Sequence, residues 1–454
     1  MPPTYGFFYK EITREGRIYV FNNPEEAARF EASGELGRAI TKPGTGPNGE
    51  TVIGDSERAL QLFYFKHGLS EPVPDPEPLL QRIEWRDGKT RISTSIAYLE
   101  ISNRVQFRYT HDFPPDNVTR PGTENPGDSI GSFRIRRAKT KFEGWFWKAP
   151  QVAPLPVTMP RYSYEMQMNW PGASVANPAA LLEDATFMFD PTEAGVFRVV
   201  VGQFKVPQGR QEMTSSGSQQ FVDRTLVSNE FARGRDIGIA VQGATRGNKL
   251  EYRFGIFNGN GVSQSIDNNA AKQVNLRLMW QPNGSQVLAQ RAWISGALYS
   301  EADFESTTAP IYAVAFTYER NDFHRTTTGN DTKSNVIGLD GIYKYKGFST
   351  LGEYYFRKRT PETGSKFDSN GGFFQAGMML NRYRTWEAAF RYGQRDINDT
   401  VDNDDITEIR GALSYYYKRH ALKFQMDFGQ LKTELPAGGS QKAKELRLQA
   451  QFIF

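Results

Sequence analysis

A group of charged residues that could select among solutes lies in one long polar segment, Val201–Gly238. Fixed cations lining a narrow constriction of low dielectric constant favour the passage of anions. Arginine–carboxylate pairs that pin the segment to a wall explain the same residues equally well, and the sequence does not decide between the two. The candidate constriction residues are Lys205, Arg210, Arg224, Arg233, Arg235, Glu212 and Asp223.

A second basic group lies on the candidate strand Phe133–Trp147. Arg137, Lys139 and Lys141 are spaced two residues apart, so they share one face of a strand. If that face lines a pore, the three side chains form a ladder of positive charge. The alternative is an ordinary polar wall. Trp145, near the end of the strand, suits the aromatic girdle of a membrane interface.

Residue types that usually carry catalysis or bind metals are scarce. The chain has no cysteine, and its four histidines are dispersed with no i, i+4 pair. We therefore expect no disulfide, no zinc site and no serine hydrolase. Gly44, Gly46 and Gly49 spell GxGxxG, but Pro47 interrupts the motif outside any strand-to-helix context, which favours an ordinary loop. The sequence predicts no catalytic residue, no metal and no cofactor.

Two further charge features identify no partner by themselves. The acidic segment Asp396–Asp405 could hold Ca²⁺ or bridge to lipopolysaccharide, but a solvated loop is the simpler interpretation. The net charge of +4 over 454 residues gives no reason to expect a nucleic-acid partner, for which a basic stripe is typical.

The elements that position these residues are identified by hydrophobic periodicity. The last residues alternate apolar and polar side chains with a period of two and end on Phe454. A soluble sandwich would explain one such strand, but not a succession of them about ten residues long. Mean hydropathy is −0.58 and no run of 18 apolar residues occurs, which excludes a helical membrane protein. The alternation favours an all-β transmembrane barrel.

The connections between these strands alternate between short turns and long polar loops, as in outer-membrane barrels. Both ends of such a barrel lie on one side, so the number of strands is even. We predict a 16-stranded antiparallel barrel. Arg291–Tyr299 resembles a spanning strand, but an even number of strands requires that it belong to a long periplasmic connection. The strands are expected near residues 101–110, 133–145, 160–170, 180–190, 196–206, 235–243, 248–258 and 272–281, followed by eight more between Ile311 and Phe454.

Residues 1–88 do not fit the barrel pattern and are expected to form an N-terminal periplasmic extension or plug, followed by the barrel domain, residues 89–454. Asn23 and Pro24 open a short helix that Gly34 can close, and a Pro-rich linker, Glu71–Pro78, follows. No secretory signal opens the chain, and we expect that a leader has been removed from this numbering.

Several motifs resemble the phosphate-selective porin O and P family of Gram-negative outer-membrane proteins. They are GQFKVP (202–207), Arg210–Glu212, Ser215–Ser216, Phe221–Arg224, GRDIG (234–238), FRIRRA (133–138), GIFNGNG (255–261), GFSTLGEYYFR (347–357) and the C-terminal Phe454. The resemblance covers roughly residues 89–454. It implies a trimeric 16-stranded porin with an inward-folded third loop, and passage of anions or phosphate past basic residues.

The expected function is passive diffusion of small hydrophilic solutes across the outer membrane. The expected partners are copies of the chain in a homotrimer, outer-membrane lipid and lipopolysaccharide, and small anionic or polar solutes. Only a modest anion preference is expected, because the inferred lumen face of the later strands mixes both signs of charge. Its residues are Arg253, Arg277, Lys344, Arg357, Arg391, Arg410, Lys423 and Arg447, together with Glu251, Glu319, Asp340, Glu353, Glu387, Glu408 and Asp427. The alternative is a barrel scaffold that is threaded by an electron-carrying partner protein or anchors a surface layer.

Overall fold

The computed structural model describes the chain in two compact units, Met1–Leu79 and Leu80–Phe454. The boundary between the units lies earlier than the predicted one at residues 88 and 89. The reason is that the hairpin of β5 (Arg82–Arg86) and β6 (Lys89–Ser93) pairs with the barrel sheet. The described residues are all except 1–7, 70–81, 87, 95–96, 116, 119–123, 147–160, 173–180, 192–195, 246–248, 263–266, 283–297, 305–308 and 326–329.

The N-terminal unit is a four-stranded sheet with helices that pack on both faces. Strand order is β1-β2-β4-β3, with β2 and β4 parallel. Ile18 and Val20 pack in the core that contains α2, whereas Tyr19 and Phe21 pack in the core that contains α1, as the strand alternation requires. The elements are β1 (Lys10–Arg14), β2 (Arg17–Phe21), α1 (Pro24–Ser33), β3 (Ile40–Lys42), β4 (Thr51–Gly54) and α2 (Glu57–His67).

The helix predicted after Asn23 is present as α1. The Asn23 side chain accepts a hydrogen bond from the Glu25 backbone N–H, and Gly34 ends the helix with φ 74°. The residues of the GxGxxG pattern lie in the connection between β3 and β4, as expected for a loop. Helix α2, which the sequence analysis did not predict, begins at Glu57 after a Ser56 cap.

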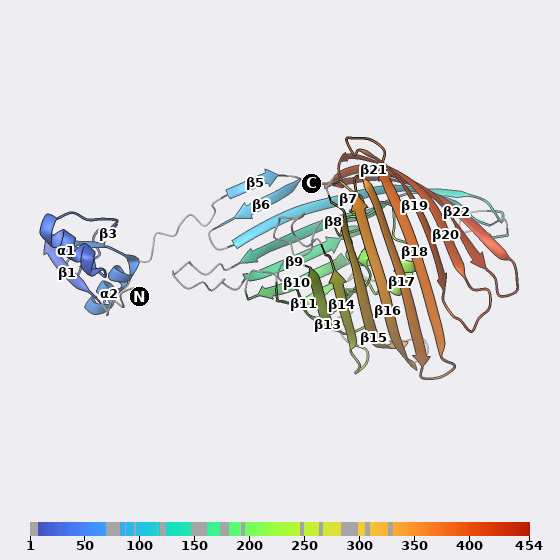
Figure 1. Cartoon of the computed structure of the whole chain (residues 1–454), viewed down its shortest axis with the longest axis horizontal. Coiled ribbons are helices and arrows are strands. Elements are labelled where there is room, and N and C mark those ends of the chain that lie inside the picture. Colours follow the sequence, from blue (N-terminus) through green and yellow to red (C-terminus); the bar gives the residue numbers. More distant parts are fainter. Residues whose placement is uncertain are drawn as a thin grey trace. The chain divides into compact units, whose positions relative to one another are not determined.

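The second unit is a closed antiparallel barrel of 16 strands, which confirms the predicted fold class (Figure 1). Closure is made by β22 and β7, with Leu448 opposite Tyr109. The strands are β7 (Ala97–Phe113), β8 (Ile130–Phe146), β9 (Arg161–Asn169), β10 (Leu182–Asp190), β11 (Arg198–Lys205), β12 (Arg235–Ala244), β13 (Leu250–Phe257), β14 (Gln273–Trp280), β15 (Ile311–Arg325), β16 (Asn330–Tyr345), β17 (Phe348–Pro361), β18 (Phe367–Met379), β19 (Trp386–Asp396), β20 (Ile406–Lys418), β21 (Leu422–Glu434) and β22 (Ser440–Ile453).

The barrel reverses the usual distribution of apolar side chains. On β21, Phe424 and Met426 are 47% and 43% exposed on the outside, whereas Lys423 and Asp427 are fully buried inside. This alternation is typical of a sheet with lipid on one side and a polar lumen on the other. Among the described residues, no helix is long and apolar enough to cross a membrane.

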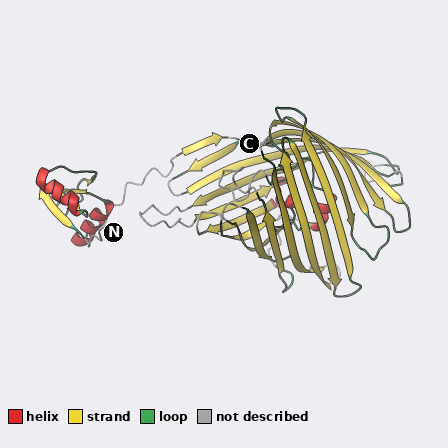
Figure 2. Ribbon diagram, in the orientation of Figure 1, coloured by secondary structure: helices red, strands yellow, loops and turns green. Residues whose placement is uncertain are grey.

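Two connections fold into the barrel. The inner loop, residues 206–234, joins β11 to β12 and carries two short helices, α3 (Arg210–Met213) and α4 (Leu226–Phe231), which lie among the strands in Figure 2. The second connection joins β14 to β15, and its residues Leu298–Phe304 are buried except for the half-buried Ser300. Arg291–Tyr299 was predicted to belong to a connection and not to a spanning strand. Most of this segment lies outside the described residues, but Leu298 and Tyr299 lie in a turn.

Candidate functional site: a basic lumen cavity

The barrel encloses a cavity of 510 Å³, which we call the lumen cavity, between the inner loop and the wall of strands β7–β13. Nine basic residues line it: Arg104, Arg136, Arg137, Lys139, Lys141, Lys205, Arg224, Arg235 and Arg253. Three acidic residues line it: Glu165, Glu183 and Asp184. The cavity wall is therefore strongly biased towards positive charge.

The acidic residues predicted for the lumen face are found mainly on the opposite wall, where they hold the inner loop. They accept hydrogen bonds from loop side chains or from loop backbone N–H groups, which a buried loop must satisfy. The pairs are Asp340 with Arg210 (3.0 Å), Glu353 with the Gln211 N–H, Glu387 with Gln220 (2.6 Å), Asp427 with the Val222 N–H (3.0 Å) and Glu408 with the Leu226 N–H (3.2 Å). Arginines also lie on this wall, but they pair with its carboxylates, as Arg277 does with Asp340 and Arg410 with Asp427.

The predicted basic ladder lines the cavity, but each member has a carboxylate partner. Arg137 lies 3.4 Å from Asp223, and Lys139 pairs with Glu183. Lys141 pairs with two carboxylates, Glu143 at 2.6 Å and Glu165 at 3.1 Å. These contacts hold the three side chains in fixed positions along β8 and reduce the net charge that each one presents.

Three predicted constriction residues line the cavity while holding the inner loop or the wall. Lys205 donates hydrogen bonds to three loop carbonyls, those of Glu212 (2.6 Å), Met213 (3.3 Å) and Thr214 (3.1 Å). Arg224 pairs with Glu212 at 3.0 Å. Arg235 forms a two-pronged pair with Asp184 on β10, at 2.9 and 2.8 Å. Glu212, the partner of Arg224, is not among the residues that line the cavity.

Two other predicted constriction residues, Arg210 and Arg233, are not among the residues that line the lumen cavity. The Arg210 side chain is fully buried on the far side of the loop and donates to Asp340, because α3 turns it towards β16. The Arg233 guanidinium donates to the Gly259 carbonyl and lies 4.0 Å from Glu319. Both side chains therefore anchor the loop to the wall.

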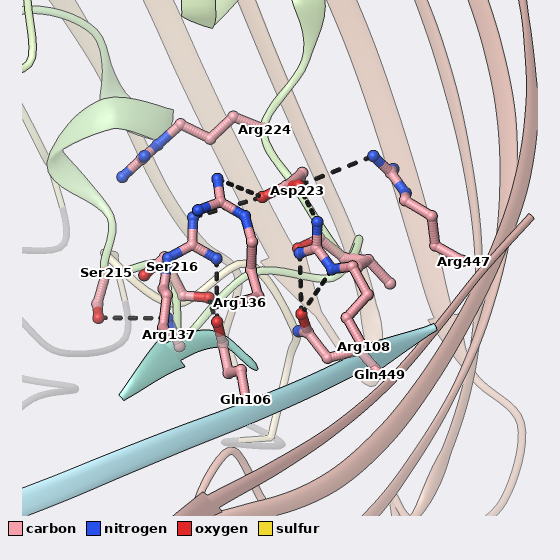
Figure 3. Close-up of polar contacts among 12 residues, drawn as sticks. Gln106, Arg108, Arg136, Arg137, Ser215, Ser216, Asp223, Arg224, Arg447 and Gln449 are labelled. Atoms are coloured by element: carbon pink, nitrogen blue, oxygen red, sulfur yellow. Dashed lines mark hydrogen bonds and ion pairs between the residues drawn. The ribbon is translucent and has the colours of Figure 1, made fainter. Parts of the chain in front are cut away.

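Asp223 connects the inner loop to the wall through four arginines (Figure 3). Arg108 and Arg137 contact its carboxylate from β7 and β8, Arg136 lies at 3.7 Å, and Arg447 lies at 3.9 Å. Burial raises the pKa of the Asp223 carboxyl, but the arginines outweigh burial and hold this pKa well below its ordinary value. Asp223 is consequently a permanent anion beside the cavity.

Two cavity-lining arginines were missed by the sequence analysis. Arg136 is the extra residue of a β-bulge, because Gln106 pairs with Arg137 whereas the next residue, Phe107, pairs with Ile135. The bulge lets two consecutive arginines line the cavity, which strict alternation excludes. The two adjacent arginines in FRIRRA (133–138) are the sequence feature that could have indicated this bulge.

Arg104 on β7 is the second missed residue. Its guanidinium donates to the hydroxyls of Ser215 (2.7 Å) and Ser216 (3.2 Å) on the inner loop. Among the described residues, no carboxylate lies within 4.0 Å of it. Its spacing from Gln106 and Arg108, two residues apart on one face, could have identified it.

The part of the chain that the structure describes contains no group of three His, Asp or Glu side chains that could hold a metal ion. The arrangement of the lumen cavity can bind and orient an anion through guanidinium, ammonium and hydroxyl donors.

Comparisons with known proteins agree with this architecture. An anion-selective porin from Comamonas acidovorans is 12% identical, with a TM-score of 0.53 over 78% of this chain and 100% of that chain. The outer-membrane channel DcaP of Acinetobacter baumannii is 8% identical, with a TM-score of 0.54 over 80% and 99% of the two chains. The trimer form of OmpT from Vibrio cholerae is 9% identical, with a TM-score of 0.50 over 78% and 99%.

At these identities the solved structures show the fold alone. A comparison with curated proteins finds no match. The family model of phosphate-selective porin O and P, in contrast, matches residues 105–454, which is nearly the whole barrel. The chain therefore belongs to the phosphate-selective porin O and P family and is an outer-membrane porin.

Proposed function

We propose that this porin passes small hydrophilic solutes by passive diffusion and favours anions, with phosphate among them. The observation that carries the proposal is the lining of the lumen cavity by nine basic and three acidic residues. An ion that enters a narrow cavity in a low-dielectric wall loses water and depends on fixed charges for compensation. A cation would meet mostly like charge there.

Arg104 and its serine partners provide the donors best suited to a passing oxyanion. The hydroxyl oxygens of Ser215 and Ser216 accept from Arg104, so their own O–H groups can donate to a solute. Arg136, whose side chain is 35% exposed, lies on the neighbouring strand. Charge-assisted donors of this kind suit phosphate as well as chloride.

We also propose a homotrimer in which the wall of short strands faces the other copies. Strands β11, β13 and β14 have 8 residues each. A strand tilted by about 45° needs about 9–11 residues to cross a bilayer. Contact with neighbouring copies would shield this wall of shorter strands from the lipid. The structurally similar OmpT is described in a trimer form. The longer strands, with exposed residues such as Phe424 and Phe428, would face lipid and lipopolysaccharide.

The decisive experiment is the reversal potential of single channels in a planar bilayer across a KCl gradient. We expect a potential of the sign that chloride permeation gives, and a reduced chloride current when phosphate is added. A zero or cation-selective potential would contradict the anion preference, and the absence of channels would contradict the pore itself.

The alternative of a barrel threaded by a partner protein gains no support from the lumen. The inner loop and Leu298–Phe304 fill part of the lumen, and the 510 Å³ cavity beside the loop is far smaller than a folded domain.

A further inference from the structure

The connection between β14 and β15 places a buried segment inside the barrel, which we call the brace segment, Leu298–Phe304. Glu301 is 2% exposed, and Ala302 and Asp303 are fully buried. The connection starts at the barrel end where the chain enters and leaves, whereas the inner loop starts at the opposite end. Two connections from opposite ends of the barrel therefore meet in the lumen.

Glu301 makes the contacts between the two connections. One carboxylate oxygen accepts from the Gln220 backbone N–H (2.8 Å) and from the Gln375 side chain on β18 (2.8 Å). The other accepts from the Gln211 side chain at 3.2 Å. The Glu301 backbone N–H donates to the Ser218 carbonyl at 3.0 Å. A single residue thus holds three points of the inner loop and one point of the wall.

The brace segment is itself fixed to successive turns at its own end of the barrel. Its backbone carbonyls accept from Lys344 (2.9 Å, at Ala302) and Arg384 (2.8 Å, at Phe304). The Asp303 carboxylate accepts from the backbone N–H of Gly347, at 2.7 Å, in the turn between β16 and β17. These anchors make the segment a fixed support rather than a second flexible loop.

We propose that Glu301 is a positioning residue that sets the bore of the pore by holding the inner loop against strands β16–β20. Residues 214–225 of the loop contain no helix, so this stretch depends on such contacts for its position. Loss of the carboxylate leaves the buried Gln220 backbone N–H without its acceptor and removes one of the two acceptors of the Gln211 side-chain amide, which is unfavourable. The loop residues that line the cavity, Met213, Ser215, Ser216 and Arg224, then lose their fixed distance from β7 and β8.

This inference rests on the inner loop bounding the conducting cavity, but it does not depend on the preference for anions. Conductance reports the bore, and the reversal potential reports charge selectivity. A conductance change in a pore without ion preference would therefore support the brace while contradicting the proposed anion selectivity.

The test compares Glu301→Ala and the milder Glu301→Gln with the unchanged protein in planar bilayers. Glu301→Ala is expected to increase single-channel conductance about twofold, with added open-channel noise and a reversal potential closer to zero. Glu301→Gln keeps the shape and one acceptor oxygen, so it is expected to show the noise with a smaller change in conductance. Glu434→Ala, at the rim of β21 beside Lys432, is the matched control and should leave all three quantities unchanged.

Folding of each variant is checked by the heat-dependent shift of the barrel band in electrophoresis. If Glu301→Ala fails to fold, Glu301→Gln decides the question. Folded variants with unchanged conductance, noise and reversal potential would overturn the proposal, since a merely structural carboxylate would lower heat resistance without altering the open channel.

Discussion

At the scale of single residues, most carboxylates of the lumen face lie away from the lumen cavity. Carboxylates on β16–β21, such as Asp340 and Glu353, are occupied in holding the inner loop. Basic residues on β7–β13 remain along the cavity. Selectivity consequently depends on which wall borders the open space, and the summed charge of the lumen face is a poor guide to it.

Arg104 is the residue whose removal should affect selectivity most directly. We expect Arg104→Gln to move the reversal potential towards zero and to weaken block by phosphate. A unit charge about 5 Å from a passing ion contributes about 1–3 kcal/mol at effective dielectric constants between bulk water and a protein surface. The measurement is the chloride-to-potassium permeability ratio. Arg320→Gln, an exposed arginine outside the cavity lining, serves as the control, and equal effects of the two substitutions would contradict the assignment.

Asp223→Asn is expected to loosen the inner loop. The substitution leaves Arg108, which is 2% exposed, without its charged partner, and breaking such a buried pair typically costs about 3–5 kcal/mol. Channel noise in bilayers and the temperature of barrel unfolding should both reveal the loss. Asp402→Asn, in an exposed loop, is the comparison, and a quiet Asp223→Asn channel with unchanged heat resistance would refute this role.

The low pKa of Asp223 also predicts a pH dependence. A carboxyl whose pKa is lowered by folding contributes stability above its unfolded pKa of about 3.9, and this contribution is lost only as pH falls through the lower folded value. The Asp223 contacts should therefore persist from pH 8 to pH 4. Recordings over this range should show no increase in noise, and a rise in noise near pH 6 would point to a different titrating group.

The sequence predicted the lumen-facing residues well but not their partners. Alternation alone identifies Arg447, Asp427 and Lys423 as inward-facing, because a strand in a barrel has only two faces. It does not show that Arg210 reaches Asp340, 130 positions away, since such a pair depends on the path of the inner loop. The role of each predicted constriction residue therefore stays a prediction, whereas its partners are visible only in the structure.

At the scale of elements, the bulge in β8 is the feature that alternation could not show. The bulge adds one residue opposite Gln106 and Phe107. Before the bulge the inward-facing positions have even numbers, such as Arg134, and after it they have odd numbers, namely Arg137, Lys139 and Lys141. All sixteen strands were identified from their period and length. The ends of the strands were less well predicted: β7 and β8 have 17 residues each, whereas strands of about ten residues were expected.

Deletion experiments can separate the bulge from the regular part of β8. Deleting Arg136 removes the extra residue and restores regular pairing, so the barrel should fold and lose part of its anion preference. Deleting Thr140 from the regular part exchanges the inner and outer faces of one end of the strand, and should prevent barrel formation. The readouts are the heat-dependent band shift and the reversal potential; equal tolerance of both deletions would contradict the register.

At the scale of the whole molecule, the chain combines a porin barrel with a separate N-terminal unit that has its own two cores. This first unit, Met1–Leu79, was predicted only as part of a periplasmic extension or plug, residues 1–88, with one helix and a Pro-rich linker. Its strands have five residues or fewer, too short for a period to stand out from a polar background.

A barrel that starts at Leu80 is expected to conduct like the full chain. The closed ring β7–β22 and all residues of the lumen cavity lie in the second unit. Single-channel conductance and reversal potential should agree between the two proteins within experimental error. A larger conductance of the shortened protein would show that the N-terminal unit acts as a plug.

The inner loop and Leu298–Phe304 are held by strands β16–β21, whereas the lumen cavity borders β7–β13, so the proposed conduit is eccentric in the barrel. The circumference of the barrel then fixes only an upper limit for the molecular sieve. Changes in the inner loop or in Leu298–Phe304 can alter the exclusion size without altering any strand, since connections tolerate substitutions that a closed sheet does not. Size selection in this porin can thus evolve separately from the membrane-spanning wall.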